Sequence, residues 1–181
     1  MISLDKLMHR SVLFITWGWL MAYVSFGNYL ERSYALGYWN HKLLSYLGIM
    51  LALAVFAFTV YYLIKRWSII QKRNEISLLY VWFSLVVSMV LINLIQFNVM
   101  EEIKFELQQP LFMVLKGLAI IITGGILRIR MLIIGGIIFT GLGWLASYYF
   151  LEDQLVLEAI GWLIAFVFPG HWLYANKRST D

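Results

Sequence analysis

The sequence contains no cysteine and few charged residues. The absence of cysteine excludes disulfide bonds, thiolate metal sites and redox chemistry of paired thiols. The chain also lacks the Gly-x-Ser-x-Gly, His-Glu-x-x-His and phosphate-loop motifs of common enzyme classes. We therefore expect no metal and no cofactor, and we do not expect an enzyme of a common class.

Apolar residues dominate the chain instead. They make up 62% of its 181 residues and charged residues only 13%, against about 45–50% and about 25% in an ordinary soluble domain. A single core of this size cannot bury so much apolar surface, so the lipid bilayer is the solvent that fits. The net charge of +4 does not indicate a nucleic-acid partner, because the basic residues are spread over connecting segments.

Six apolar runs have the length that a membrane-spanning helix needs, which is roughly 17–25 residues. The sequence therefore predicts an all-α polytopic integral membrane protein, a six-transmembrane-helix bundle that forms one domain over residues 1–181. The first run is too long for the apolar region of a signal peptide, so we expect it to be retained. The predicted spans are Ser11–Leu30, Leu43–Ile64, Ile76–Met100, Pro110–Leu127, Met131–Leu151 and Leu155–Tyr174.

The basic residues between these spans predict the orientation of the bundle. One side holds both termini and the basic residues Lys6, Arg10, Lys65, Arg66, Lys72, Arg73, Arg128, Arg130, Lys177 and Arg178, and the other side holds only Arg32, Lys42 and Lys104. The positive-inside rule then places both termini in the cytoplasm, and we expect a bacterial inner (cytoplasmic) membrane. The basic segment Lys65–Arg73 is a candidate contact for anionic lipid or a cytoplasmic partner.

Glycines mark a predicted helical hairpin. Gly117 and Gly124 are seven residues apart on one span, and Gly136 and Gly143 are seven apart on the next. Seven residues make about two helical turns, so each pair lies on one helix face. Small residues let membrane helices approach closely, which predicts either plain close packing or a hairpin that slides or hinges.

Two segments of the chain resemble each other. Gly18–Leu30 reads GWLMAYVSFGNYL and Gly161–Leu173 reads GWLIAFVFPGHWL, with seven of thirteen positions identical. Inverted repeats frame midplane sites in some transporters. Two three-helix halves would, however, pair the first span with the fourth, and a restricted membrane alphabet also produces chance matches.

Ionisable residues inside a span are functional-site hypotheses by default. At 1.5 Å per residue, Lys116 lies roughly 18 Å and Glu158 roughly 24 Å from the predicted cytoplasmic ends of their spans. A lysine side chain extends over most of that difference, so we predict an ion pair in the outer half of the bilayer. Amides at a similar depth complete a predicted ligand or ion site, or alternatively a structural clasp: Asn28, Asn93 and Gln96.

A proline and a histidine interrupt the last span near its cytoplasmic end. Pro169 lacks an N–H and crowds the preceding turn, which predicts a kink that frees the carbonyl near Ala165. His171 is then an interfacial helix-end residue, a donor to that carbonyl or a proton relay. A haem or metal site shared with His9 has no supporting ligand cluster in the sequence.

Three functions fit these patterns. The first is a small integral-membrane channel or transporter-like subunit, a homo-oligomer or part of a complex with another membrane protein, with its polar site in the outer half of the bilayer. The second is a non-catalytic accessory or anchor subunit of a larger complex, in which the polar residues hold helices together. The third is an intramembrane enzyme that acts on lipid, with His171 at the inner headgroups.

Overall fold

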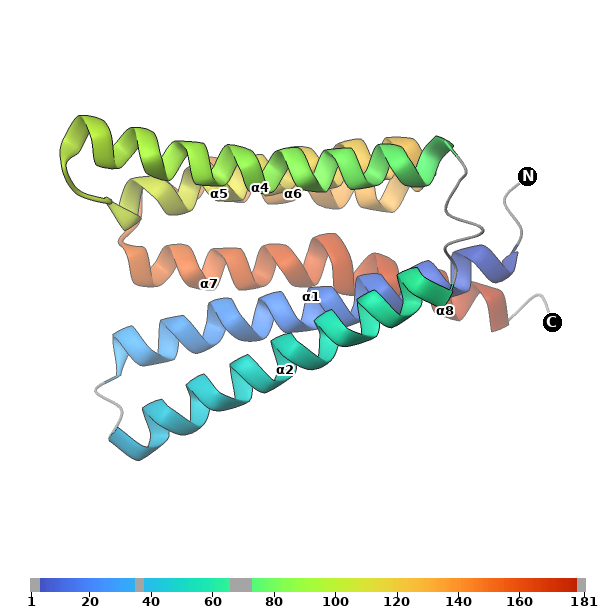
Figure 1. Cartoon of the computed structure of the whole chain (residues 1–181), viewed down its shortest axis with the longest axis horizontal. Coiled ribbons are helices and arrows are strands. Elements are labelled where there is room, and N and C mark those ends of the chain that lie inside the picture. The colour runs from blue at the N-terminus through green and yellow to red at the C-terminus, as the bar shows by residue number, and fades with distance from the viewer. Residues whose placement is uncertain (1–3, 35–37, 66–72, 179–181) are drawn as a thin grey trace.

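A computed structural model describes residues 4–34, 38–65 and 73–178 of the chain. Most of these residues are helical, and no strand occurs among them. The elements are α1 (Leu4–Ser33), α2 (Tyr38–Lys65), α4 (Arg73–Met100), α5 (Phe105–Leu127), α6 (Arg130–Ala146), α7 (Leu151–Trp162), the π-helix η1 (Leu163–Val167) and α8 (Phe168–Arg178). The predicted all-α class is thus confirmed for the described part of the chain, and α7, η1 and α8 follow one another as one continuous rod (Figure 1).

The helices have the composition of a membrane bundle. Four stretches in the described residues are long and apolar enough to cross a membrane: Lys42–Tyr61, Ile76–Met100, Phe105–Leu127 and Leu151–Ala175. α6 is a shorter apolar helix of 17 residues, about 25 Å at 1.5 Å per residue. The apolar side chains of α2 and α4 are mostly exposed, with Phe56 at 61% and Phe83 at 69%. Such long exposed apolar faces are rare on soluble monomers, and they fit a bilayer.

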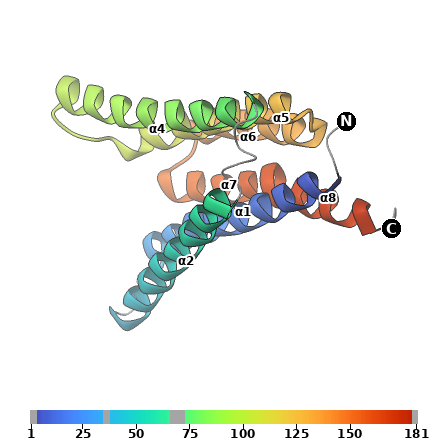
Figure 2. The same ribbon diagram turned by 45° about the vertical axis from the view of Figure 1, so that its right-hand side comes forward.

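The bundle has two layers. α4, α5 and α6 form one layer, and α1, α2 and the α7–α8 rod form the other (Figures 1 and 2). α5 packs most extensively on α6, and α1 packs on α7, η1 and α8. The layers meet where α6 and α5 contact α7 and η1, and the core lies there, around Met113, Ile120, Leu132, Phe139 and Ala165.

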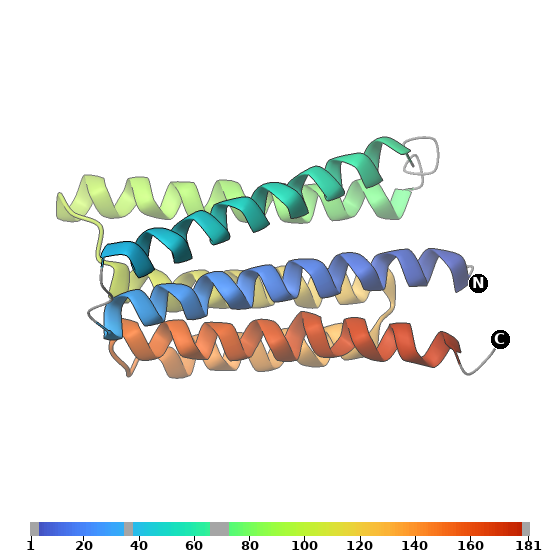
Figure 3. The same ribbon diagram turned by 90° about the horizontal axis from the view of Figure 1, so that it is seen from below.

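The two ends of the bundle differ in what they carry. The start of α1, the end of α8 and the turn between α5 and α6 lie at one end (Figures 1 and 3). The opposite end, called the distal end from here on, is where α1 ends, α4 joins α5 and α6 joins α7. Of the basic segment Lys65–Arg73, residues 66–72 lie outside the described residues, so its predicted lipid contact stays a prediction.

The predicted glycine packing of the α5–α6 hairpin is confirmed. Gly117, Gly124, Gly136 and Gly143 are all buried. A Cβ atom on Gly124 would come within 2.9 Å of the backbone nitrogen of Ile133, and one on Gly143 within 3.0 Å of the nitrogen of Val114. The two backbones therefore approach so closely that no side chain fits between them at these positions.

Predicted span boundaries at the distal end differ from the helix ends in the structure. α6 ends at Ala146 rather than near Leu151, and residues 147–150 join it to α7. Glu152 and Asp153, predicted as a loop, occupy the first turn of α7, where the helix dipole favours acidic side chains.

The start of α5 also differs from the prediction, so that Pro110 lies inside the helix. The sequence predicts that this span begins at Pro110, whereas α5 begins at Phe105. A proline at this position cannot donate to the carbonyl of Glu106 four residues earlier. The side-chain amide of Gln154 supplies the missing donor, because its Nε2 donates to Glu106 O over 3.1 Å.

A π-helical turn precedes the second proline. In η1 the backbone hydrogen bonds span five residues instead of four: the N–H of Phe168 donates to the carbonyl of Leu163. Pro169 follows directly and is fully buried, whereas His171 is exposed. The predicted irregularity thus takes the form of a π-turn, which is one recognised cause of a bend in a helix.

The two similar segments lie on neighbouring antiparallel helices but face different partners. A Cβ atom on Gly18 of α1 would meet Phe166 and Val167 of η1. The matching Gly161 of α7 faces the ring of Phe139 on α6 instead. Equivalent glycines therefore do not make equivalent contacts.

Candidate functional site

Glu158 is the centre of a buried polar network inside the bundle. It lies in the second turn of α7, and only 5% of its surface is exposed. α7 carries it toward the junction of the two layers, where α1 and α5 both pack against this rod. A carboxylate in such apolar surroundings needs a counter-charge and hydrogen-bond donors, because removing it from water costs on the order of several kcal/mol.

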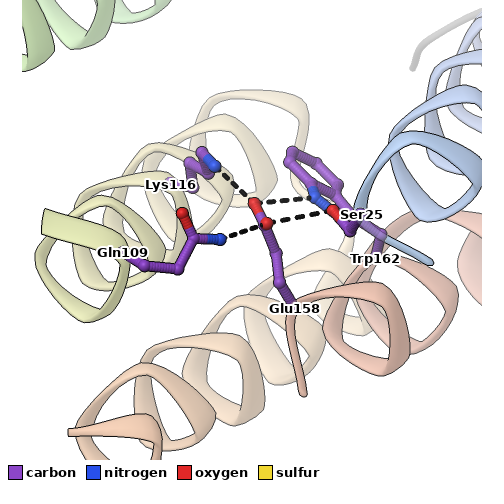
Figure 4. A network of polar contacts seen from close by, with 5 residues as sticks. All are labelled: Ser25, Gln109, Lys116, Glu158 and Trp162. Atoms are coloured by element: carbon purple, nitrogen blue, oxygen red, sulfur yellow. Dashed lines mark hydrogen bonds and ion pairs between the residues drawn. The ribbon is translucent and has the colours of Figure 1, made fainter. Parts of the chain in front are cut away.

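Four side chains supply these donors (Figure 4). Lys116 and the indole of Trp162 donate to Oε1 of Glu158, the indole over 3.4 Å. Ser25 and Gln109 donate to Oε2, the hydroxyl over 2.9 Å. Both carboxylate oxygens therefore have two donors each, contributed by α1, α5 and α7.

Lys116 makes the charged contact of the network. It lies on α5 about two turns beyond Gln109, and the side chains of both residues approach Glu158. Its ammonium group forms an ion pair with Oε1 of Glu158, and 16% of the lysine side chain is exposed against 6% for the glutamate. The ion pair predicted from the depths of these residues is therefore present.

Trp162 closes the apolar side of the site. It lies one turn after Glu158 on the same rod, and the Lys116 ammonium lies 6.0 Å from its ring centroid. The indole also packs edge-on against Phe139 at 5.0 Å and Phe166 at 5.3 Å. These rings exclude water from one face of the ion pair, which strengthens its electrostatic attraction.

The other residues of the predicted site lie outside this network. Asn28 is exposed on α1, so the structure does not bring it to Glu158. Asn93 and Gln96 lie on α4, which packs on α5, and Gln96 is buried with 6% of its surface exposed. His171 and Pro169 lie on α8, more than two helical turns beyond Glu158 along the rod.

Sequence reasoning missed three members of the network. Gln109 falls just before the predicted start of its span, Ser25 is a small hydroxyl in an apolar run, and Trp162 lies in the apolar run of the last span. A signal was nevertheless present for Trp162, because it follows Glu158 by four residues and so shares its helix face. Gln109 precedes Lys116 by seven residues, which places those two on one face as well.

In this arrangement the negative charge of Glu158 is balanced by the positive charge of Lys116. No group of three or more His, Asp or Glu side chains that would suit a metal ion occurs among the described residues. The carboxylate of Glu158 accepts a hydrogen bond from the hydroxyl of Ser25, which lies on another helix.

Comparison with known proteins gives this chain no relative. No protein-family profile, no curated protein and no solved structure matches it.

Proposed function

We propose that this chain is a small integral-membrane channel or transporter-like subunit in which Glu158 is the ion-binding centre. In this proposal six spans cross the membrane, both termini are cytoplasmic, and the membrane is a bacterial inner membrane. The distribution of basic residues supports that topology, since most of them fall at the end that holds the termini. The Glu158 network then lies in the outer half of the bilayer.

A buried carboxylate paired with a lysine across three helices is the observation that carries this proposal. Replacing a buried ion pair by apolar residues is often neutral or stabilising, so a buried pair by itself is weak evidence for a purely stabilising role. Charged groups within membrane spans commonly mark ion or substrate pathways. In this proposal Lys116 is the counter-ion of Glu158 in the absence of a bound ion. A cation that displaces the Lys116 ammonium group binds to the carboxylate of Glu158 in its place.

The test is ion flux in proteoliposomes. The wild-type chain is reconstituted, and the uptake of radiolabelled sodium and rubidium and of protons is compared with that of protein-free vesicles. We expect flux in the wild type and a loss of at least tenfold in Glu158→Gln. Glu102→Gln is the matched control, because Glu102 is an exposed carboxylate paired with Lys104 over 3.2 Å. Flux that equals the protein-free background in the wild type would overturn the proposal.

A second candidate function is a non-catalytic accessory or anchor subunit. It is favoured by the complete set of four donors on Glu158, which is also what a permanent clasp requires. The exposed apolar faces of α2 and α4 would then cover a partner as well as lipid. Co-purification of a stoichiometric membrane partner, together with an absence of flux, would favour this candidate over transport.

A further inference from the structure

The proline inside α5 leaves one backbone carbonyl without its usual partner close to the Glu158 network. Pro110 has no N–H, so it cannot donate to the carbonyl of Glu106, four residues earlier. The side-chain amide of Gln154 on α7 donates to this carbonyl over 3.1 Å. A hydrogen bond that would ordinarily lie within α5 is therefore made between α5 and α7.

Gln154 also holds the start of its own helix. Its Nε2 donates a second hydrogen bond, over 2.9 Å, to the carbonyl of Tyr149 in the connection from α6. An amide nitrogen carries two hydrogens, so both are used. Only 1% of Gln154 is exposed, and its Oε1 is buried without a donor among the described residues. Because an unpaired buried oxygen is unfavourable, it is the two donated hydrogen bonds that favour an amide at this position.

The Gln154 contact and the Glu158 network lie one helical turn apart. Gln154 precedes Glu158 by four residues on α7, a rise of about 6 Å. Glu106 precedes Gln109 by three residues on α5, a rise of about 4.5 Å, and Gln109 donates to Glu158. Both helices begin at the distal end, so the two contacts follow each other in the same direction along α5 and α7 (Figure 1). The first contact therefore fixes the position along α5 at which the second is made.

The contact between α5 and α7 depends on such individual side chains. α7 packs more extensively on α1 and α6 than on α5. Of the two α5 residues that reach Glu158, Gln109 is shorter and less flexible than Lys116, so its hydrogen bond tolerates a smaller shift of α7 along α5. Ser25 donates to the same carboxylate from α1, whose packing on α7 does not involve Gln154. Loss of the Gln154 contact should therefore affect Gln109 and leave Ser25 in place.

We propose that Gln154 is a positioning residue for Glu158. By pairing the carbonyl that Pro110 leaves free, it holds α7 at the register at which Gln109 reaches the carboxylate. One part of this inference rests on the proposed function, namely that Gln154 thereby sets the affinity of Glu158 for the transported cation. The dependence of Gln109 on Gln154 is tested without transport.

The experiment is a double-variant cycle on the full chain, unfolded reversibly in mixed micelles. Gln109→Leu removes a donor to a carboxylate, and in the otherwise wild-type chain it should raise the equilibrium constant of unfolding by about tenfold. In the Gln154→Leu chain Gln109 no longer reaches Glu158, so the same change should raise that constant by less than about threefold. Gln109 and Gln154 donate to different acceptors, so this difference reports the register of the two helices.

Gln108→Leu and Ser25→Ala are the matched controls. Gln108 is the neighbouring amide on α5, and Ser25 donates to the same carboxylate oxygen as Gln109 but from α1. The effect of each should add to that of Gln154→Leu within about twofold. Additive effects of Gln154→Leu and Gln109→Leu would overturn the inference. An equally strong coupling of Gln154→Leu with Ser25→Ala would also overturn it, because Gln154 would then affect the whole core rather than the register of α5 and α7.

Pro110→Ala keeps the test decisive if Gln154→Leu does not fold. Alanine returns an N–H to this position, so the Glu106 carbonyl is paired within α5 when Gln154 is removed. The oxygen has two lone pairs, and Gln154 can still donate to it when present. The same cycle is then measured in the Pro110→Ala chain, with the same expected loss of the Gln109 effect. An undiminished Gln109 effect would mean that Gln154 only satisfies the carbonyl, and it would refute the positioning role.

Flux in proteoliposomes tests the part that rests on the proposed function. The sodium or rubidium concentration that gives half-maximal flux should shift by about threefold or more in Gln154→Leu, by the same factor and in the same direction as in Gln109→Leu, without a further shift in the double variant. Non-additive unfolding in a chain without flux would support the register and refute transport. Flux that depends on Glu158, with additive unfolding, would retain transport and refute the role of Gln154.

Discussion

Removing both partners of the Lys116–Glu158 ion pair should destabilise the bundle by less than the sum of the two single removals. Glu158→Gln leaves the ammonium of Lys116 without its counter-charge in a mostly buried position. Lys116→Met leaves the carboxylate with its remaining donors, Ser25, Gln109 and Trp162. The double variant replaces two charges by two neutral side chains of similar size, so no charge stays unpaired.

The magnitudes follow from these surroundings. Breaking a buried ion pair costs about 3–5 kcal/mol, and we expect about 3 kcal/mol for Glu158→Gln, since part of the lysine remains exposed. The three remaining donors reduce the cost of Lys116→Met to about 2 kcal/mol. The double variant should cost about 2 kcal/mol rather than about 5 kcal/mol, which gives a coupling energy of about 3 kcal/mol.

The assay is reversible unfolding in mixed micelles, with the free energy of unfolding measured for the four chains of the cycle. The exposed pair Glu102–Lys104 provides the control cycle, because its side chains are 63% and 55% exposed. We expect a coupling energy there below about 0.5 kcal/mol, as is usual for surface pairs. A coupling energy below about 0.5 kcal/mol in the Lys116–Glu158 cycle would refute the reasoning.

Two further predictions concern packing and the neutral donors. Gly117→Ala should lower the free energy of unfolding by about 1–3 kcal/mol, because the new Cβ would lie 2.8 Å from the backbone nitrogen of Thr140. Gly125→Ala, where a Cβ meets nothing within 4 Å, should be neutral or stabilising, and equal losses in both variants would contradict the packing. Ser25→Ala removes a donor to a charged group and should cost about 1.5–3 kcal/mol in the same unfolding assay. Ser84→Ala is its control, since that exposed hydroxyl donates only to Val81 O, and an effect as large there would count against the network.

The sequence predicted the helices better than their ends. Apolar runs long enough to cross a bilayer predict helices, because every backbone N–H and C=O group inside the membrane must be hydrogen-bonded within the segment. The ends were uncertain because polar residues occur both in loops and in first turns. Glu152 and Asp153 belong to α7, and Phe105–Gln109 belong to α5, although both stretches look like connections in the sequence.

For the site, charge and depth were sufficient to pair Lys116 with Glu158, since two opposite charges in apolar spans have few other ways to be compensated. Depth alone could not select the neutral partners. Ser25 and Asn28 lie three residues apart on α1, yet Ser25 is buried against Glu158 and Asn28 is exposed. Rotation of a helix about its axis decides between them, and that rotation depends on packing against neighbours.

The sequence by itself therefore determined the helical class, the apolar character of the chain, the close glycine-lined hairpin and the charged pair. Each of these follows from local composition and from the periodicity of a helix. Only the tertiary structure decided which face of each helix is buried, which donors surround Glu158, and that Gln154 satisfies the carbonyl freed by Pro110. Those contacts join residues that are far apart in the chain, and no local pattern records the rotation and depth at which two helices meet.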